Sequence, residues 1–197
     1  MMKKILMLIF GISLLFSNDE LVLDASNSFT LTMRKNSGAP INALMQNAKA
    51  VVIFPKVTKV GLILGGMHGN GIMVVGSPYS PSEIWPVSIS GGSVGLQIGY
   101  ENSSLVIFIL KESIVSDIKD AKITLKADAS FAFGEIGQNY GKISDFKFSS
   151  SIYAYASNDG FFAGASFGGA VISKSDTNEL NKNSYGYSSL LNSFSKF

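Results

Sequence analysis

The chain has 197 residues, of which 46% are hydrophobic and 15% charged, and its formal net charge is +2. This length suits one domain with a buried core, and the composition excludes a disordered chain. Because cysteine is absent and histidine occurs once, disulfide scaffolds, iron–sulfur clusters, cysteine nucleophiles and His-rich metal sites are excluded. We therefore expect neither a metal ion nor a cofactor.

The first 17 residues are expected to be a secretory signal peptide. A short basic start, Met1–Lys4, precedes an apolar stretch over residues 5–16, and Ser17 follows. The stretch is shorter than the roughly 20 residues of a membrane-spanning helix. We predict cleavage after Ser17 and a periplasmic or envelope-associated chain, with a retained anchor as the alternative. A lipid-modified lipoprotein is excluded because no cysteine is present.

Removal of this leader leaves a neutral chain. The leader holds two of the 16 basic residues and none of the 14 acidic ones, so residues 18–197 carry 14 of each sign. Binding to a phosphate backbone requires a basic face, and we therefore expect no nucleic-acid partner.

Residues 19–48 are predicted to form two helices. An apolar stripe recurs at intervals of four residues, formed by Leu21, Ala25, Phe29 and Met33. Asn36-Ser37-Gly38 breaks the pattern, and Pro40 suits the first turn of a second helix that ends near Ala48.

From Ala50 onward the pattern predicts strands. Residues 50–54 form an apolar run that Pro55 stops, and the glycine-rich residues 65–71 are interpreted as the turn of a hairpin. Residues 93–100 alternate between apolar and small or polar side chains, which is typical of a strand with one buried face.

The second half of the chain continues this pattern. Residues 105–110 form an apolar strand, residues 111–118 a short helix, and residues 122–130 another alternating strand. A late hairpin is predicted within residues 146–172, with Asp159-Gly160 as its turn signal.

About eight strands with frequent glycine predict a mainly β, α+β fold. Ten of the 20 glycines fall between Gly61 and Gly99, and glycine inside strands marks bends or close backbone contacts. We expect a strongly curved, barrel-like antiparallel sheet with helices from both ends of the chain packed on it. Residues 18–197 are expected to form a single domain.

Several motifs then occur in order along the chain. They are Ala48–Val57, Gly65-Gly66-x-x-Gly69-x-Gly71, Ser90–Gly99, Ala127–Ser130, Tyr155–Gly164 and Tyr185-Gly186. In this order they resemble the SYLF domain family over roughly residues 20–194. The resemblance implies a lipid-binding domain: eukaryotic members bind phosphoinositides, partly through an amphipathic N-terminal helix, and some bind actin. Bacterial members are typically exported and associate with phospholipids. For an exported chain we expect phospholipid or an anionic membrane surface as the partner, and not actin.

Lipid contacts would need both basic and apolar side chains. Three lysines near Pro55 would form a basic rim worth roughly 3 kcal/mol at an anionic bilayer, so firm binding must also bury apolar area. The apolar side chains would come from the first helix or from the segment after Gly160, with ordinary core packing as the alternative for each. The candidate lipid contacts are Leu21, Phe29, Met33, Arg34, Lys35, Lys49, Lys56, Lys59, Phe161 and Phe162.

No catalytic residue is predicted. Ser93 lies in a Gly-x-Ser-x-Gly pattern, but in a strand-like alternation and not at a strand-to-helix elbow. His68 is interpreted as an exposed turn residue, and Gly65–Gly71 as a tight hairpin, with a backbone nest for a lipid phosphate as the alternative. We expect a non-catalytic phospholipid-binding domain of the bacterial envelope. The alternative is a small structural outer-membrane β-barrel.

Overall fold

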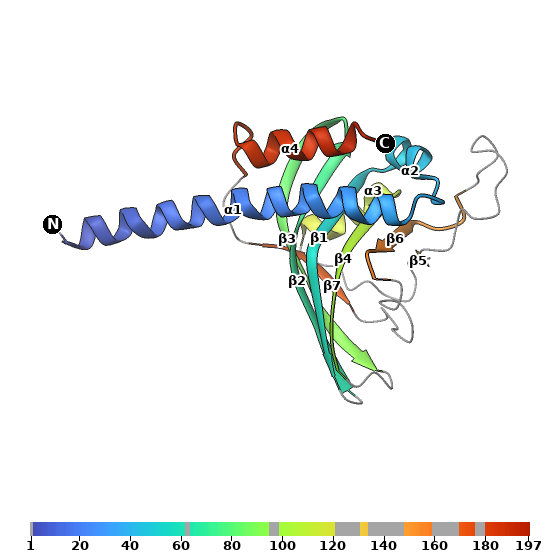
Figure 1. Ribbon diagram of the computed structural model, residues 1–197, viewed down its shortest axis with the longest axis horizontal. Helices are drawn as coiled ribbons and strands as arrows, with labels where there is room; N and C mark the ends of the chain where they lie inside the picture. The colour runs from blue at the N-terminus through green and yellow to red at the C-terminus, as the bar shows by residue number, and fades with distance from the viewer. Residues whose placement is uncertain are drawn as a thin grey trace.

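The computed structural model shows one curved, seven-stranded sheet with helices on both faces (Figure 1). The structure describes residues 2–61, 64–94, 99–120, 131–133, 148–158, 170–175 and 180–197. Only the backbone is described for residues 2–17, 61, 64, 93–94, 99 and 131–133. The helices are α1 (Met2–Lys35), α2 (Ile41–Asn47), α3 (Glu112–Lys119) and α4 (Tyr185–Phe194). The strands are β1 (Ala50–Gly61), β2 (Leu64–Ser77), β3 (Ser80–Val94), β4 (Gly99–Ile109), β5 (Phe131–Phe133), β6 (Ile152–Ala156) and β7 (Val171–Lys174).

The strand order is β5-β6-β4-β1-β2-β3-β7, and every pair is antiparallel except β5 with β6. The predicted mainly β fold with helices packed on a curved antiparallel sheet is confirmed. The predicted barrel-like closure is corrected, because within the described residues β5 and β7 are open edges of the sheet. Both edge strands are short: β7 pairs with four residues of β3, and β5 with three of β6.

The two predicted N-terminal helices are confirmed. Helix α1 ends at Lys35, where the Asn36 side-chain amide donates to the carbonyl oxygens of Thr32 at 2.8 Å and Ala156 at 3.1 Å. Pro40 precedes α2, and Ala48 returns to an extended conformation. At its other end α1 begins at Met2 and continues without interruption through the predicted leader, whose cleavage stays a prediction.

Two strand assignments made from the sequence are wrong. The predicted strand over residues 93–100 is divided, since β3 ends at Val94 and β4 begins at Gly99. In the described part of the predicted late hairpin the two halves do not pair with each other: β6 pairs with β4, whereas β7 pairs with β3 at the far side of the sheet, and residues 159–169 lie outside the described residues. Alternation identifies a strand but says nothing of its partner. Residues 122–130 and Asp159-Gly160 lie outside the described residues.

The glycine-rich residues 65–71 lie inside strand β2 and do not form the predicted turn. Strand β1 has a bulge between Ile53 and Lys56, at Pro55, which has no N–H to donate to a neighbouring strand. A Cβ atom on Gly69 would lie 2.6 Å from the carbonyl oxygen of Lys56, and one on Gly71 would collide with that of Ile53. These glycines are therefore required for the close approach of β2 to the bulge.

Each face of the sheet has its own hydrophobic core. We call the side covered by α1, α2 and α4 the helical face; its buried strand residues include Val51, Ile53, Ile72, Val74, Val106 and Phe108. The opposite face buries a second set, including Val52, Phe54, Met73, Leu105 and Ile107. Helix α3 packs on this opposite face through Ile114, Val115 and Ile118.

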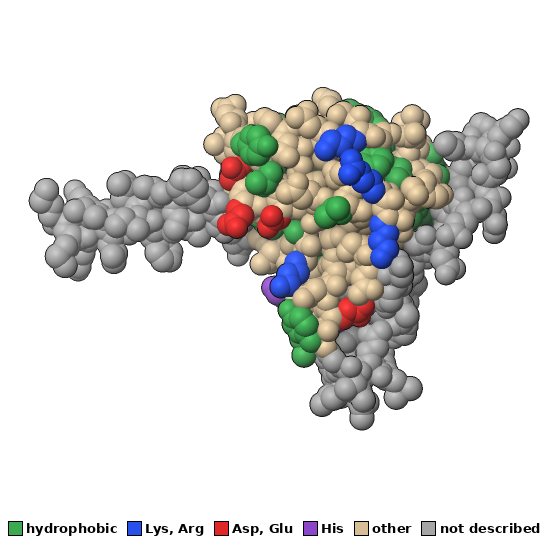
Figure 2. Space-filling model, in the orientation of Figure 1, with side chains coloured by type: hydrophobic (Ala, Val, Ile, Leu, Met, Phe, Trp, Pro, Cys, Tyr) green, Lys and Arg blue, Asp and Glu red, His purple; other side chains and the backbone are tan. Residues whose placement is uncertain are grey.

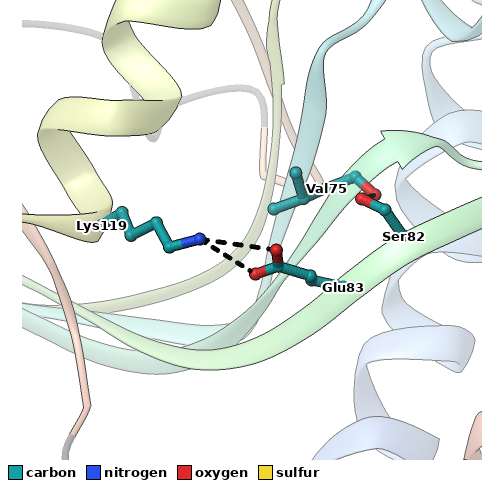
Figure 3. Close-up of polar contacts among 4 residues, drawn as sticks. All are labelled: Val75, Ser82, Glu83 and Lys119. Carbon is teal, nitrogen blue, oxygen red and sulfur yellow. Dashed lines mark hydrogen bonds and ion pairs between the residues drawn. The ribbon is translucent and has the colours of Figure 1, made fainter.

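Polar contacts also join α3 to β3 (Figure 3). Lys119 Nζ lies 3.4 Å from both carboxylate oxygens of Glu83 and 5.0 Å from the centre of the Trp85 ring. Nearby, the Ser82 hydroxyl donates to the carbonyl oxygen of Val75 at 3.1 Å. Lys119 and Glu83 are each about half exposed, so their ion pair contributes at most about 1 kcal/mol. The apolar side chains of α3 therefore dominate its attachment.

The close approach at the bulge gives a direct stability prediction. Gly71→Ala should lower the free energy of unfolding by about 2 kcal/mol or more, because the methyl group forces the two backbones apart. Gly66→Ala, in the same strand, is the matched control, since a Cβ atom there meets nothing within 4 Å. Urea unfolding of both variants measures the difference, and equal stabilities would contradict this role of Gly71.

Candidate functional site

The apolar stripe of α1 lies in the core of the helical face. Phe29 and Met33 are fully buried, and Leu21 is partly buried against the same cluster. The Phe29 ring meets Phe194 of α4 edge to face, with centroids 4.9 Å apart. These three predicted lipid contacts therefore lie in the core, which was the alternative considered for them. Contact with lipid through them would require α1 to leave the sheet.

Polar contacts hold α1 along the length that covers the sheet. Three hydrogen bonds join its side chains to the neighbouring elements: Asp19 with the Gly186 N–H at 3.1 Å, Ser26 with Ser189 at 2.9 Å, and Thr32 with Ser104 at 2.7 Å. Helix α4 thus runs beside α1 in the same direction (Figure 1). A Cβ atom on Gly186 would lie 2.6 Å from Asp19 Oδ1, which explains the glycine of the Tyr185-Gly186 motif physically.

The outer side of α1 carries the predicted basic pair. Arg34 and Lys35 are exposed in its last turn, and Leu31, one turn earlier, is 63% exposed. We call these three residues the α1 ridge. Residues at this spacing share one side of a helix. Glu20 and Asp24 are exposed nearer the start of the covered part, so acidic and basic side chains occupy opposite ends of this surface (Figure 2).

The three lysines near Pro55 do not form the predicted basic rim. Lys49 is exposed just before β1, and Lys56 is exposed on the helical face. Lys59 is only 5% exposed and lies on the opposite face, level with Val57 and Met67 of that core. Pro55 occupies a bulge within β1 and not a turn, so Lys49 and Lys59 are separated by roughly 30 Å of strand. The rim prediction is therefore corrected.

Lys59 belongs to a buried polar cluster that the sequence analysis did not identify. It is the cross-strand partner of Glu101, whose carboxylate accepts a hydrogen bond from the Asn158 side chain at 2.8 Å. Burial lowers the pKa of Lys59, and the charge of Glu101 opposes that shift. The signal in the sequence was weak, because Lys59 and Glu101 are 42 positions apart and only strand register brings them together.

The burial of Lys59 predicts a pH dependence of stability. Its pKa lies below the usual 10.5, so between these two values the unfolded chain holds more protons than the folded one, and stability rises with pH. Replacement by Met removes this contribution. The free energy of unfolding of the wild type, relative to Lys59→Met, should therefore increase as the pH rises from 7 toward 10.5.

Urea unfolding across that pH range measures the effect, with Lys56→Met at an exposed position of the same strand as control. A difference between the wild type and Lys59→Met that does not change with pH would contradict the assignment.

The remaining chemical candidates assemble no reactive centre in the described part of the chain. His68 is exposed in the middle of β2 and is flanked across the sheet by Thr58 and Ser90, so its predicted place in a turn is corrected. Among residues with described backbone, Gly76 is the glycine with positive φ, and the extended Gly65–Gly71 segment does not form the nest considered as the alternative. Across the described residues, no three His, Asp or Glu side chains gather as metal ligands would.

Several predicted features cannot be placed. Phe161 and Phe162 lie outside the described residues, and for Ser93 only the backbone is described. Within the described part of the chain, no helix has both the length and the hydropathy needed to cross a membrane.

Comparison with known proteins now defines the family. Residues 90–192, more than half of the chain, match the family model described as "Ysc84: Las17-binding protein actin regulator". The chain therefore belongs to the Ysc84 (SYLF) family, and the resemblance seen in its motifs is confirmed.

Curated relatives agree with this assignment. The SH3 domain-containing YSC84-like protein 1 of Homo sapiens is 30% identical over 141 residues, which cover 68% of this chain and 40% of the relative. The protein of the same name from Xenopus laevis is 32% identical over 128 residues, which cover 62% and 37%. The chain thus spans about two fifths of the length of these relatives. No solved structure matches.

Proposed function

We propose that this chain is an exported, non-catalytic phospholipid-binding domain that acts at the bacterial cell envelope. Family membership supports a binding module of the SYLF type, and the leader-like start supports export. Cleavage after Ser17 would also leave intact Asp19, the first α1 side chain with a described hydrogen bond to the rest of the protein.

The observation that carries the proposal is the α1 ridge. An exposed leucine stands beside two basic side chains, whereas the other described apolar side chains of α1, from Leu21 to Met33, are buried or partly buried. At an anionic bilayer, each basic residue contributes about 1 kcal/mol, and burial of a leucine side chain about 2 kcal/mol. Together these contributions amount to about 4 kcal/mol, which corresponds to a millimolar dissociation constant. Attachment of this strength is weak and reversible. A neutral chain adds no long-range attraction, so contact must be short-range.

Catalysis and actin binding are not part of the proposal. His68 is exposed on a strand, with Thr58 and Ser90 as its cross-strand neighbours, an environment that offers no general acid or base partner. The family description mentions actin regulation and Las17, and the curated relatives are named for an SH3 domain and are more than twice as long as the matched region. Export would separate this chain from actin, whereas envelope phospholipid would be present.

The test is co-sedimentation of the protein, as a secreting bacterial host produces it, with vesicles of phosphatidylglycerol and phosphatidylcholine. Binding is expected at low salt and should weaken as salt rises. The charge reversal Arg34→Glu/Lys35→Glu should lower the affinity by about tenfold or more, since it replaces attraction at the membrane with repulsion.

The matched control is Lys111→Glu/Lys182→Glu, which changes the net charge equally at exposed positions away from the ridge and should leave binding nearly unchanged. If the wild type fails to co-sediment at low salt, the proposed function is wrong. Equal losses in both double variants would remove the ridge as the contact surface.

A further inference from the structure

The helices cover only part of the helical face. Beyond the β1 bulge, strands β1–β4 extend past α1, and none of the described helices covers them there (Figure 1). We call this part, residues 56–61, 64–70, 88–94 and 99–103, the distal sheet. Its described exposed side chains on the helical face include the hydroxyl and amide groups of Asn70, Ser90 and Asn102, together with two basic residues, Lys56 and His68. A polar surface of this kind needs no covering layer.

Among the side chains that the structure describes, two large hydrophobic ones interrupt this polar surface. Val60 is 54% exposed and Tyr100 is 63% exposed, and the two residues are direct cross-strand partners. We call them the tip pair. Their exposed side chains combine into one small patch near the end of the sheet, and Figure 2 shows hydrophobic atoms there beside the single histidine and a basic side chain.

The hydroxyl group of the tip-pair tyrosine has polar and basic neighbours. Hydrogen bonds with Asn102 and Thr58 lower the pKa of the Tyr100 phenol, and the nearby Lys56 contributes in the same direction. Thr58 and Asn102 are themselves joined by a 2.7 Å hydrogen bond. Polar side chains thus lie near the phenol hydroxyl, while Tyr100 as a whole stays 63% exposed.

The charge around the tip pair favours an anionic partner. Among the described residues of the distal sheet, Lys56 and His68 have exposed basic side chains on this face, and Lys56 lies near Tyr100. The carboxylate nearest in sequence, Glu101, points to the other face, where it binds Asn158. A tyrosine beside a lysine on an exposed apolar patch is the combination found at membrane–water interfaces.

The size of the patch argues against a protein partner. A stable protein interface buries about 800 Å² on each side around an apolar centre, and the two described side chains of the tip pair are too small to form such a centre by themselves. A bilayer interface requires no shape complementarity and accepts a small apolar insertion beside a positive charge.

We infer that the distal sheet enters the headgroup region of an anionic bilayer, with Val60 and Tyr100 in its apolar boundary and Lys56 at the phosphates. This inference rests on the proposed function and adds a second contact surface to it. The α1 ridge and the tip pair both lie on the helical side of the molecule, and the additional buried area raises an affinity that the ridge alone leaves weak.

Vesicle binding by variants of the full chain, produced as above, tests the inference. Val60→Ser/Tyr100→Ser should bind phosphatidylglycerol-containing vesicles about tenfold more weakly than the wild type, because most of the apolar area of the patch is removed. The control is Tyr79→Ser/Tyr185→Ser, at two tyrosines that are 50% and 74% exposed elsewhere on the protein. Circular dichroism checks that all variants fold, as expected for surface changes.

The depth to which the distal sheet enters the bilayer is measured independently, by quenching of tryptophan fluorescence with brominated lipids. The Tyr100→Trp variant should be quenched on vesicle binding, whereas Tyr79→Trp, at the opposite end of the β2–β3 hairpin, should not; the buried Trp85 is common to both.

Three results would overturn the inference. In the first, the wild type binds vesicles, Val60→Ser/Tyr100→Ser binds them equally well, and the fluorescence of the Tyr100→Trp variant is not quenched. The proposed function then stands without the tip pair. In the second, the wild type forms a concentration-dependent dimer that Val60→Ser/Tyr100→Ser does not form. The patch is then a contact between two copies of the chain. In the third, the wild type does not bind vesicles at all, which removes the proposed function together with this inference.

Discussion

The packing of Phe29 against the rings of Phe194 and Phe197 fixes α1 between the sheet and α4. It places the apolar stripe of α1 in the core of the helical face, where full burial of one such side chain is worth about 1.5–3 kcal/mol. Detaching α1 would expose this whole stripe and break the hydrogen bonds from Asp19, Ser26 and Thr32. The side chains left for a partner are therefore those that this packing excludes from the core.

The bulge at Pro55 is the second constraint on where contacts can occur. It interrupts the pairing of β1 with β2 and β4 and requires glycine at positions 69 and 71. On the helix-covered side of this point the sheet carries α1, α2 and α4, and beyond it the helical face is open. Among the described residues, the α1 ridge and the tip pair are two separate places where an exposed hydrophobic side chain stands near basic ones, on the same side of the sheet. A membrane-binding role would use both, since each alone is weak.

Local signals in the sequence predicted the helices well. The i+4 stripe, the break at Asn36–Gly38 and Pro40 identified α1 and α2, and residues 105–118 were assigned correctly to a strand and the start of a helix. These features depend on residues close together in the chain, where helix periodicity and breakers act. The family, too, was recognisable from its ordered motifs.

Most of the errors involve contacts between distant residues. Glycines 65–71 indicated a turn, but they are glycine because β2 passes close to a bulge in another strand. The predicted late hairpin failed because β6 and β7 join opposite sides of the sheet. The lysine rim failed because Pro55 occupies a bulge within a strand and not a turn, and residues three apart in a strand, such as Lys56 and Lys59, lie on opposite faces. The tip pair could not be predicted, because only the register of β1 with β4 brings Val60 to Tyr100.

The central claim is that α1 remains packed on the sheet while the protein binds lipid. An engineered disulfide tests it directly, because the chain has no cysteine and the Ser26 and Ser189 hydroxyl oxygens are 2.9 Å apart. Ser26→Cys/Ser189→Cys would lock α1 to α4 when oxidised and release it when reduced. The account predicts equal affinity for anionic vesicles in both states. Binding by the reduced form alone would contradict it, and would show that the buried residues Phe29 and Met33 reach the lipid.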